Sequence, residues 1–196
     1  RREFLRSVGA AAALAAVGAV PKAGLADSKS APPLTHLSAK KLAKLIADRE
    51  VSAVEVAEAY LNRIAEVNPR LNAIVQMDAE RIRAEAQQAD KDLSKGVTKG
   101  PLHGVPFTMK DQMLTKGITT SNGCPELRSY VPTEDATVVK RLKDAGGILL
   151  GKTNVPEMCY QSITDNVVYG RTNNPYDLSR TPNGSSGGEA AIIAAC

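Results

Sequence analysis

Two serines lie among glycines near the end of the chain, in the run NGSSGG at residues 183–188. Glycine has no Cβ, so such a loop can bring backbone N–H groups and a hydroxyl close to a ligand. The residues that follow, 189–195, have the composition of a helix. A tight turn with a serine cap before a helix would have the same composition, and the loop chemistry alone does not separate the two interpretations.

Lys110 ends an apolar run at residues 105–109, which we expect to form a buried strand. Cleavage of an amide requires an activated nucleophile, an acid for the leaving nitrogen and donors for the oxyanion. Neither His36 nor His103 lies in a serine-rich motif. A lysine can replace histidine as the base if burial lowers its pKa, because desolvation disfavours the ammonium form. The alternative is a lysine that reaches solvent from the strand end.

Three motifs occur in order: GVPFTMKD at 104–111, YGRTNNP at 169–175 and RTPNGSSGGE at 180–189. Together they closely resemble the amidase signature family, over about Leu34 to Cys196. The resemblance implies an α/β fold, an α/β/α sandwich around a mixed sheet, of which this chain holds only the N-terminal part. One position departs from the family pattern, because Asn183 stands where the family usually has glycine.

The resemblance also implies roles for individual residues. Lys110 aligns with the catalytic lysine, the general base, and Ser185 with a serine that relays protons between that lysine and the nucleophile. In the family this serine follows a cis peptide bond, here Gly184–Ser185. Ser186 would be a supporting hydroxyl, and Cys159 falls where the family places a wall residue of the acyl pocket. A core cysteine is an equally good interpretation of Cys159.

The nucleophile that the family uses is a third serine in a later glycine-serine motif, whereas eleven residues follow Ser185 here. We therefore expect a fragment of a longer hydrolase, inactive by itself. The complete enzyme would hydrolyse a small-molecule carboxylic amide by Ser-Ser-Lys catalysis, without cofactor or metal. One alternative is the amidase subunit of a tRNA-dependent amidotransferase. Another is a non-catalytic anion-binding module at 184–189, although this loop lacks GxxxxGK[ST] and carries Glu189.

The composition limits the remaining function classes. With 43% hydrophobic residues in 196, the chain can form a packed core. A net charge of +4, with acids interspersed among the bases and no tryptophan, argues against a nucleic-acid groove. Three cysteines without a CxxC spacing and two distant histidines argue against a disulfide framework or a structural metal. The sequence does not indicate the oligomeric state.

The first residues resemble an export signal. Paired arginines precede an apolar run at 10–20 and small residues at 23–26, which is typical of a twin-arginine signal peptide. About 11 apolar residues are too few for a stable membrane span, which needs about 20. We therefore expect a signal peptide at 1–26, a linker at 27–33 and the amidase domain at 34–196, with export to the periplasm. A core helix is the alternative for the apolar run.

The periodicity predicts scaffold elements around the motifs. Helices are expected from residue 35, from Ser52 with a capping box, at 78–93 and from Thr133 with Val138 and Val139 inward. Asn68-Pro69 should end the second helix. Strands at 105–109 and 148–154 that flank a helix predict an α/β layer with a mixed or parallel sheet.

Overall fold

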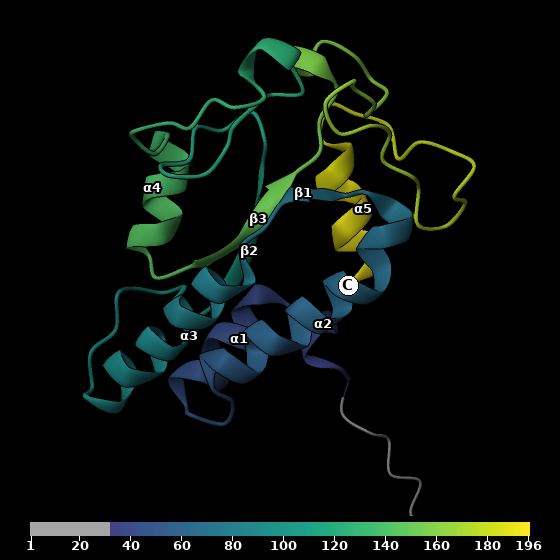
Figure 1. The fold of residues 1–196 in the computed structure, drawn as a ribbon. Coiled ribbons are helices and arrows are strands. Elements are labelled where there is room, and N and C mark those ends of the chain that lie inside the picture. The colour runs from purple at the N-terminus through teal and green to yellow at the C-terminus, as the bar shows by residue number, and fades with distance from the viewer. Residues whose placement is uncertain (1–31) are drawn as a thin grey trace, which may run out of the picture. The chain divides into compact units, whose positions relative to one another are not determined.

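The computed structural model describes residues 32–196 (Figure 1). The predicted signal peptide, 1–26, and most of the predicted linker lie outside the described residues. Three strands alternate with helices and short 3-10 turns along this part of the chain. The helices are α1 Ala39–Ala47, α2 Ala53–Leu71, α3 Ala79–Ser94, α4 Thr137–Asp144 and α5 Gly187–Ala195. The strands are β1 Ile74–Gln76, β2 Pro106–Lys110 and β3 Ile148–Thr153.

The sheet is mixed, as the sequence predicts. Its order is β1-β3-β2, with β3 antiparallel to β1 and parallel to β2. Every residue of β3 is buried, because this strand has a neighbour on each edge and helices against its faces. The parallel register sets Lys110 opposite Thr153, so the carboxyl ends of β2 and β3 lie together.

Helices cover both faces of the sheet, which confirms the predicted layers. Side chains alternate between the faces of a strand. Ile148 and Leu150 therefore point to one side, where they pack with α2, α3 and α5 in the larger apolar cluster. Leu149 points to the other side and packs with Met109 and Val139 of α4.

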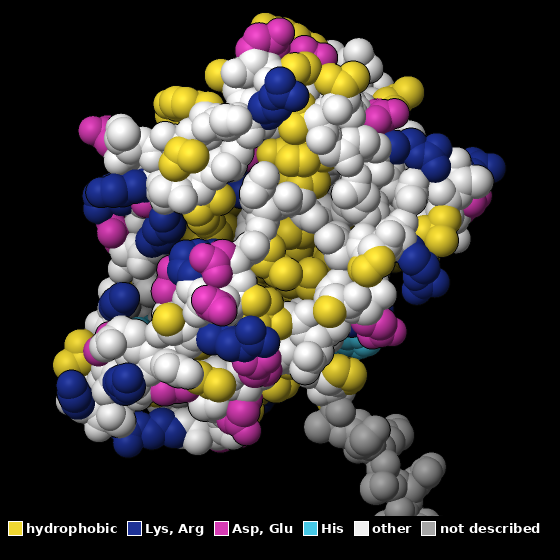
Figure 2. Space-filling model, in the orientation of Figure 1, with side chains coloured by type: hydrophobic (Ala, Val, Ile, Leu, Met, Phe, Trp, Pro, Cys, Tyr) yellow, Lys and Arg dark blue, Asp and Glu magenta, His cyan; other side chains and the backbone are white. Residues whose placement is uncertain are grey.

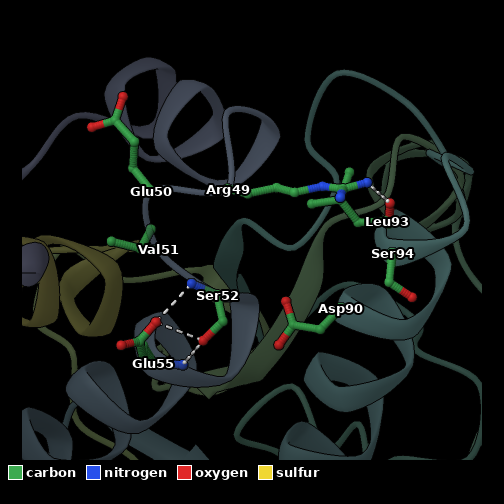
Figure 3. A pocket seen from close by; sticks show the side chains of 8 residues that line it. All are labelled: Arg49, Glu50, Val51, Ser52, Glu55, Asp90, Leu93 and Ser94. Carbon is green, nitrogen blue, oxygen red and sulfur yellow. Dashed lines mark hydrogen bonds between the residues drawn. The ribbon is translucent and has the colours of Figure 1, made fainter.

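The start of α2 is held by two sets of polar contacts. Ser52 and Glu55 form the predicted capping box, in which each side chain accepts from the other residue's backbone N–H. Asp90 of α3 accepts hydrogen bonds from the N–H groups of Ala53 and Val54, at 2.7 and 3.1 Å. These groups lie around a surface pocket between the ends of α1, α2 and α3 (Figure 3). Because its Ser52, Glu55 and Asp90 groups satisfy the end of α2, we assign this pocket a structural role.

The prediction that Asn68-Pro69 ends the second helix is wrong. The helix α2 continues to Leu71 with Pro69 in its last turn, where a missing N–H costs only one hydrogen bond. It ends at Asn72, whose φ of 51° is left-handed. The Asn68 side chain then accepts from Ala73 N and Ile74 N at 2.9 and 2.8 Å, which directs the chain into β1.

The helix predicted from Thr133 begins later, at Thr137. Val139 is buried as expected, but Val138 is 43% exposed, so its predicted inward orientation is wrong. The last helix begins at Gly187, two residues before the predicted start. Among residues 32–196, none of the helices combines the length and the apolar character that crossing a membrane requires.

Candidate active site

The structure brings Lys110 and Ser185 together across 75 residues of sequence. Lys110 is the last residue of β2, and Ser185 lies just before α5. The Nζ atom of Lys110 donates a hydrogen bond to Ser185 Oγ at 2.7 Å. Both residues are half-buried, and the peptide bond Gly184–Ser185 is cis. The pair thus has the separation and the partial access to solvent that proton transfer to a further group would need.

A second contact joins the same two elements. Thr108 lies two residues before Lys110 on β2, and therefore on the same face of the strand. Its hydroxyl donates to Glu189 Oε2, in the first turn of α5, at 2.6 Å. The contact fixes α5 against β2 beside the lysine–serine pair. Sequence reasoning did not find it, because neither residue type at these positions signals a partner 81 residues away.

Glycines allow the start of α5 to approach the backbone of β3 closely. A Cβ added at Gly188 would lie 2.4 Å from Asn154 N and 2.7 Å from Ala73 O. The Gly188 N–H donates to Asn154 O at 3.2 Å, and the Gly187 N–H to Thr164 Oγ1 at 3.2 Å. Both glycines are buried. Since their N–H groups already have partners in the protein, the geometry argues against an anion-binding nest at this helix end.

The YGRTNNP motif serves as support beneath the site. Asn154 follows β3, and its Nδ2 donates to Gly170 O and Thr172 Oγ1 at 2.9 and 3.0 Å. The Thr172 hydroxyl donates in turn to Asn72 O at the end of α2, at 2.7 Å. Asn166 donates to Asn154 Oδ1 at 2.8 Å. These buried and part-buried bonds hold the motif between α2 and β3, where it positions the loop that leads to Ser185.

The other two predicted residues do not contact the pair by hydrogen bonds. Ser186 is the exposed N-cap of α5, and within residues 32–196 its hydroxyl makes no hydrogen bond. Cys159 has a left-handed φ of 61°, and its thiol donates to Asn122 Oδ1 at 3.4 Å. The supporting role of Ser186 and the pocket role of Cys159 stay predictions.

An apolar cavity of about 410 Å³ lies between α2, β2 and α5. Thr108 and Glu189 contribute its polar edge, and Tyr60 and Cys196 line it as well. Burial raises the pKa values of the Tyr60 hydroxyl and the Cys196 thiol, so both are neutral near pH 7. Figure 2 shows hydrophobic side chains gathered in a hollow on the face that displays α5.

One group of potential metal ligands occurs among the described residues. Ligand atoms of Cys124, Glu126 and Glu157 lie within 4.8 Å of one another at the surface. The Cys124 thiol donates to Glu126 Oε2 at 2.9 Å, and this bond raises the pKa of Cys124. The hydrogen bond accounts for the approach of two of the three groups without an ion, so we assign no metal to this group.

Comparisons with known proteins point to the same family as the three sequence motifs. A family model described as Amidase matches residues 55–196. A glutamyl-tRNA(Gln) amidotransferase subunit of Acidothermus cellulolyticus is 47% identical over 162 residues, which cover 83% of this chain and 32% of that protein. Acylamidase of Rhodococcus erythropolis is 45% identical over 162 residues, 83% of this chain and 34% of that protein.

Solved structures show the same likeness. Fatty acid amide hydrolase matches with a TM-score of 0.79 and 31% identity, over 83% of this chain and 29% of that chain. A bacterial aryl acylamidase of the amidase signature enzymes family matches with a TM-score of 0.78 and 30% identity. The match covers 83% of this chain and 34% of that chain. The chain therefore spans about a third of the length of the proteins that it resembles.

Proposed function

We propose that this chain, which belongs to the amidase signature family, carries the general base and the bridging serine of an enzyme that hydrolyses carboxylic amides. Lys110 is the base and Ser185 the bridge. The observation that carries the proposal is the 2.7 Å contact between Lys110 Nζ and Ser185 Oγ. A nucleophilic serine and the oxyanion donors would come from outside these 196 residues, since the chain covers about a third of its relatives.

The pair can act as a two-step proton relay. With its lone pair free, Lys110 Nζ accepts the hydroxyl proton of Ser185, while Ser185 Oγ takes the proton of the nucleophilic serine. The nucleophile's oxygen bonds to the amide carbon, and the C–N bond breaks as the proton returns through Ser185 to the leaving nitrogen. Water then attacks the resulting ester by the same relay, which releases the acid and regenerates both serines.

The surroundings support this assignment. The contact of Thr108 with Glu189 and the close approach of Gly188 to β3 hold the elements that carry the pair. Proton transfer needs donor and acceptor within about 2.6–3.2 Å, and small displacements lower the rate. A scaffold that fixes β2 against α5 therefore serves this chemistry directly.

The test is hydrolysis by the intact protein, measured on a panel of acyl amides and anilides with Lys110→Ala and Ser185→Ala variants. We expect each substitution to lower kcat/KM by about 10²- to 10⁴-fold, the usual contribution of a proton-transfer group. Lys116→Ala is the matched control, because Lys116 is an exposed lysine six residues further along. Retention of wild-type rates by Lys110→Ala, with the fold intact, would refute the assignment.

A second candidate is the release of ammonia from glutamine for a tRNA-dependent amidotransferase. It is favoured by the 47% identity to the glutamyl-tRNA(Gln) amidotransferase subunit of Acidothermus cellulolyticus. The export signal proposed for residues 1–26 favours the first candidate, because a periplasmic enzyme would not meet aminoacylated tRNA. Ammonia release from glutamine, compared with hydrolysis of the acyl-amide panel, separates the two.

A further inference from the structure

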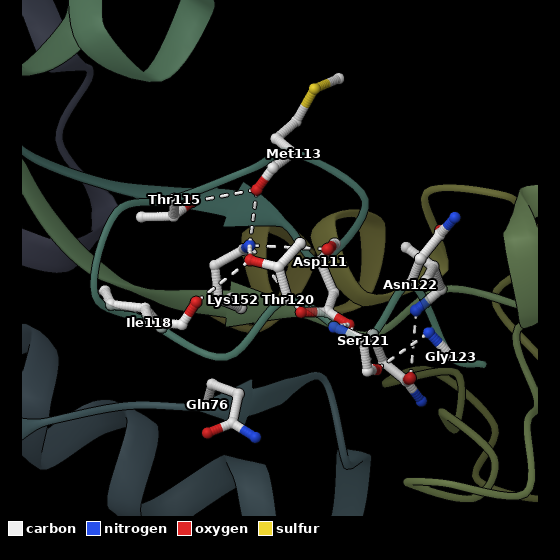
Figure 4. A network of polar contacts seen from close by, with 12 residues as sticks. Gln76, Asp111, Met113, Thr115, Ile118, Thr120, Ser121, Asn122, Gly123 and Lys152 are labelled. Carbon is white, nitrogen blue, oxygen red and sulfur yellow. Dashed lines mark hydrogen bonds and ion pairs between the residues drawn. The ribbon is translucent and has the colours of Figure 1, made fainter. Parts of the chain in front are cut away.

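A second lysine lies beside the site and is fully buried. Lys152 is on β3, and its backbone is in register with Met109, the neighbour of Lys110. Its side chain is 0% exposed. Within the protein, the Nζ atom donates to Met113 O at 2.7 Å and Thr120 Oγ1 at 2.9 Å, with Asp111 O at 3.5 Å (Figure 4). All three acceptors belong to the segment 111–120, which continues the chain directly from Lys110.

Asp111 forms the second half of this cluster. Its Oδ2 accepts from the N–H and hydroxyl of Ser121, at 3.1 and 2.8 Å. Its Oδ1 is buried, has no hydrogen-bond partner among the described residues and lies 3.8 Å from Lys152 Nζ. The Asp111 N–H donates to Thr153 O at 3.0 Å. Asp111, the residue after Lys110, is thus held to β3 by a backbone hydrogen bond and to Lys152 by the attraction between opposite charges.

Packing alone does not require a lysine at this position. A buried ion pair is often replaced by apolar residues of similar volume with no loss of stability, because both charges must be removed from water. The amine of Lys152 has three donors, and the acceptors that surround it converge from one loop. Such a cluster fixes the path of that loop, which an apolar side chain would leave free to adjust.

We propose that Lys152 is a positioning residue of the lysine–serine site: its ammonium group holds the segment 111–120 in place and thereby fixes Lys110 against Ser185. The proposal rests on the proposed function, in that Lys110 and Ser185 are taken as the reacting pair. Lys152 itself does not contact either of them.

The surroundings of Lys152 set the pH range in which its amine is charged and attracts the Asp111 carboxylate. Burial lowers the pKa of Lys152 to about 8, while Asp111 and Asp135 raise it and Lys143 lowers it further. The group therefore carries its charge at neutral pH and loses it in mildly alkaline solution. The neutral amine keeps its hydrogen bonds to the segment but no longer attracts the Asp111 carboxylate, so the charge attraction between the two residues operates only below this pH.

The test measures the accessibility of Lys110 directly, in the intact, folded protein at pH 7. Trace labelling with acetic anhydride, followed by peptide mass spectrometry, gives the acetylation rate of each lysine. Lys152→Met removes the charge at similar volume, and Thr120→Val removes one acceptor. We expect either change to raise the labelling rate of Lys110 at least threefold. Thr120→Ser keeps the hydroxyl and should leave the rate unchanged, as should Lys140→Met, which alters an exposed lysine.

The outcomes separate this inference from the proposed function. Unchanged labelling of Lys110 in a folded Lys152→Met protein overturns the inference. If that variant does not fold, equal labelling in the Thr120→Val and Thr120→Ser proteins overturns it. Faster labelling together with a lower kcat and an unchanged KM for amide hydrolysis supports both. Faster labelling in a protein without any amide hydrolysis supports the positioning role and refutes only the proposed function.

Discussion

The contact between α5 and β3 predicts that Gly188→Ala is strongly destabilising, although alanine is the better helix former. The new Cβ would stand 2.4 Å from Asn154 N and 2.7 Å from Ala73 O. Both are backbone atoms, joined to each other by a hydrogen bond of 2.8 Å. Neither can rotate away as a side chain would, so the helix start must move.

The size of the effect follows from three contributions. Overpacking of a rigid site costs about 1–3 kcal/mol. Displacement of α5 also breaks the bond from Gly188 N to Asn154 O, and an unsatisfied buried partner costs about 1–3 kcal/mol. Alanine regains about 1 kcal/mol of helix propensity. The net loss is about 3 kcal/mol, which lowers the Tm of a domain of this size by about 6–12 °C.

Thermal and urea unfolding followed by circular dichroism measures this loss. Ala190→Leu is the control, because it adds a larger side chain to the exposed side of the same helix and should shift Tm by no more than about 1–2 °C. The movement of α5 also displaces Ser185, three residues earlier, so amide hydrolysis should fall along with stability. A Gly188→Ala protein that melts within about 1 °C of the wild type, about a quarter of a kcal/mol, would refute the steric reasoning.

One further substitution and one pH dependence have clear expected outcomes. Thr108→Val removes the donor to Glu189, so we expect a loss of about 1–2 kcal/mol in urea unfolding and a larger effect on kcat than on KM, with Thr108→Ser close to wild type. Equal kinetics for the valine and serine variants would contradict this role. For Lys152, burial lowers the pKa from 10.5 to about 8. The unfolded chain therefore keeps a proton that the native state releases, and the free energy of unfolding should rise by up to about 3 kcal/mol as pH increases across this interval. Urea unfolding of wild type and Lys152→Met at several pH values measures this rise as the difference between their free energies of unfolding. A difference that does not change with pH would rule it out.

Local signals in the sequence predicted much of the scaffold. The spacing of Ser52 and Glu55 located the start of α2, because a capping box depends only on neighbours in sequence. The apolar runs located β2 and β3, which the sheet buries. Pro69 misled the prediction, since a proline tolerated in a last turn has the same local sequence as one that ends a helix.

The candidate site was predicted only in part, because many of its contacts join residues that are distant in sequence. Lys110 and Ser185 were found through motifs that resemble a family, and the structure then placed them 2.7 Å apart. The partners that hold them were not found. Thr108 and Lys152 are ordinary strand residues by type, and their partners are distant in sequence, 81 and 32 or more residues away. Only the three-dimensional arrangement shows which polar groups are buried together.

The order of the strands in space has a consequence for how the protein is made. Both β1 and β2 pair only with β3 in the described sheet, and β3 is the last of the three along the chain. During synthesis the edges of β1 and β2 therefore stay unpaired until β3, which ends at Thr153, has left the ribosome. Pairings of this range are slow to form, and open strand edges can join to other chains. Newly made chains should accordingly depend on chaperones during this interval more than the finished protein does.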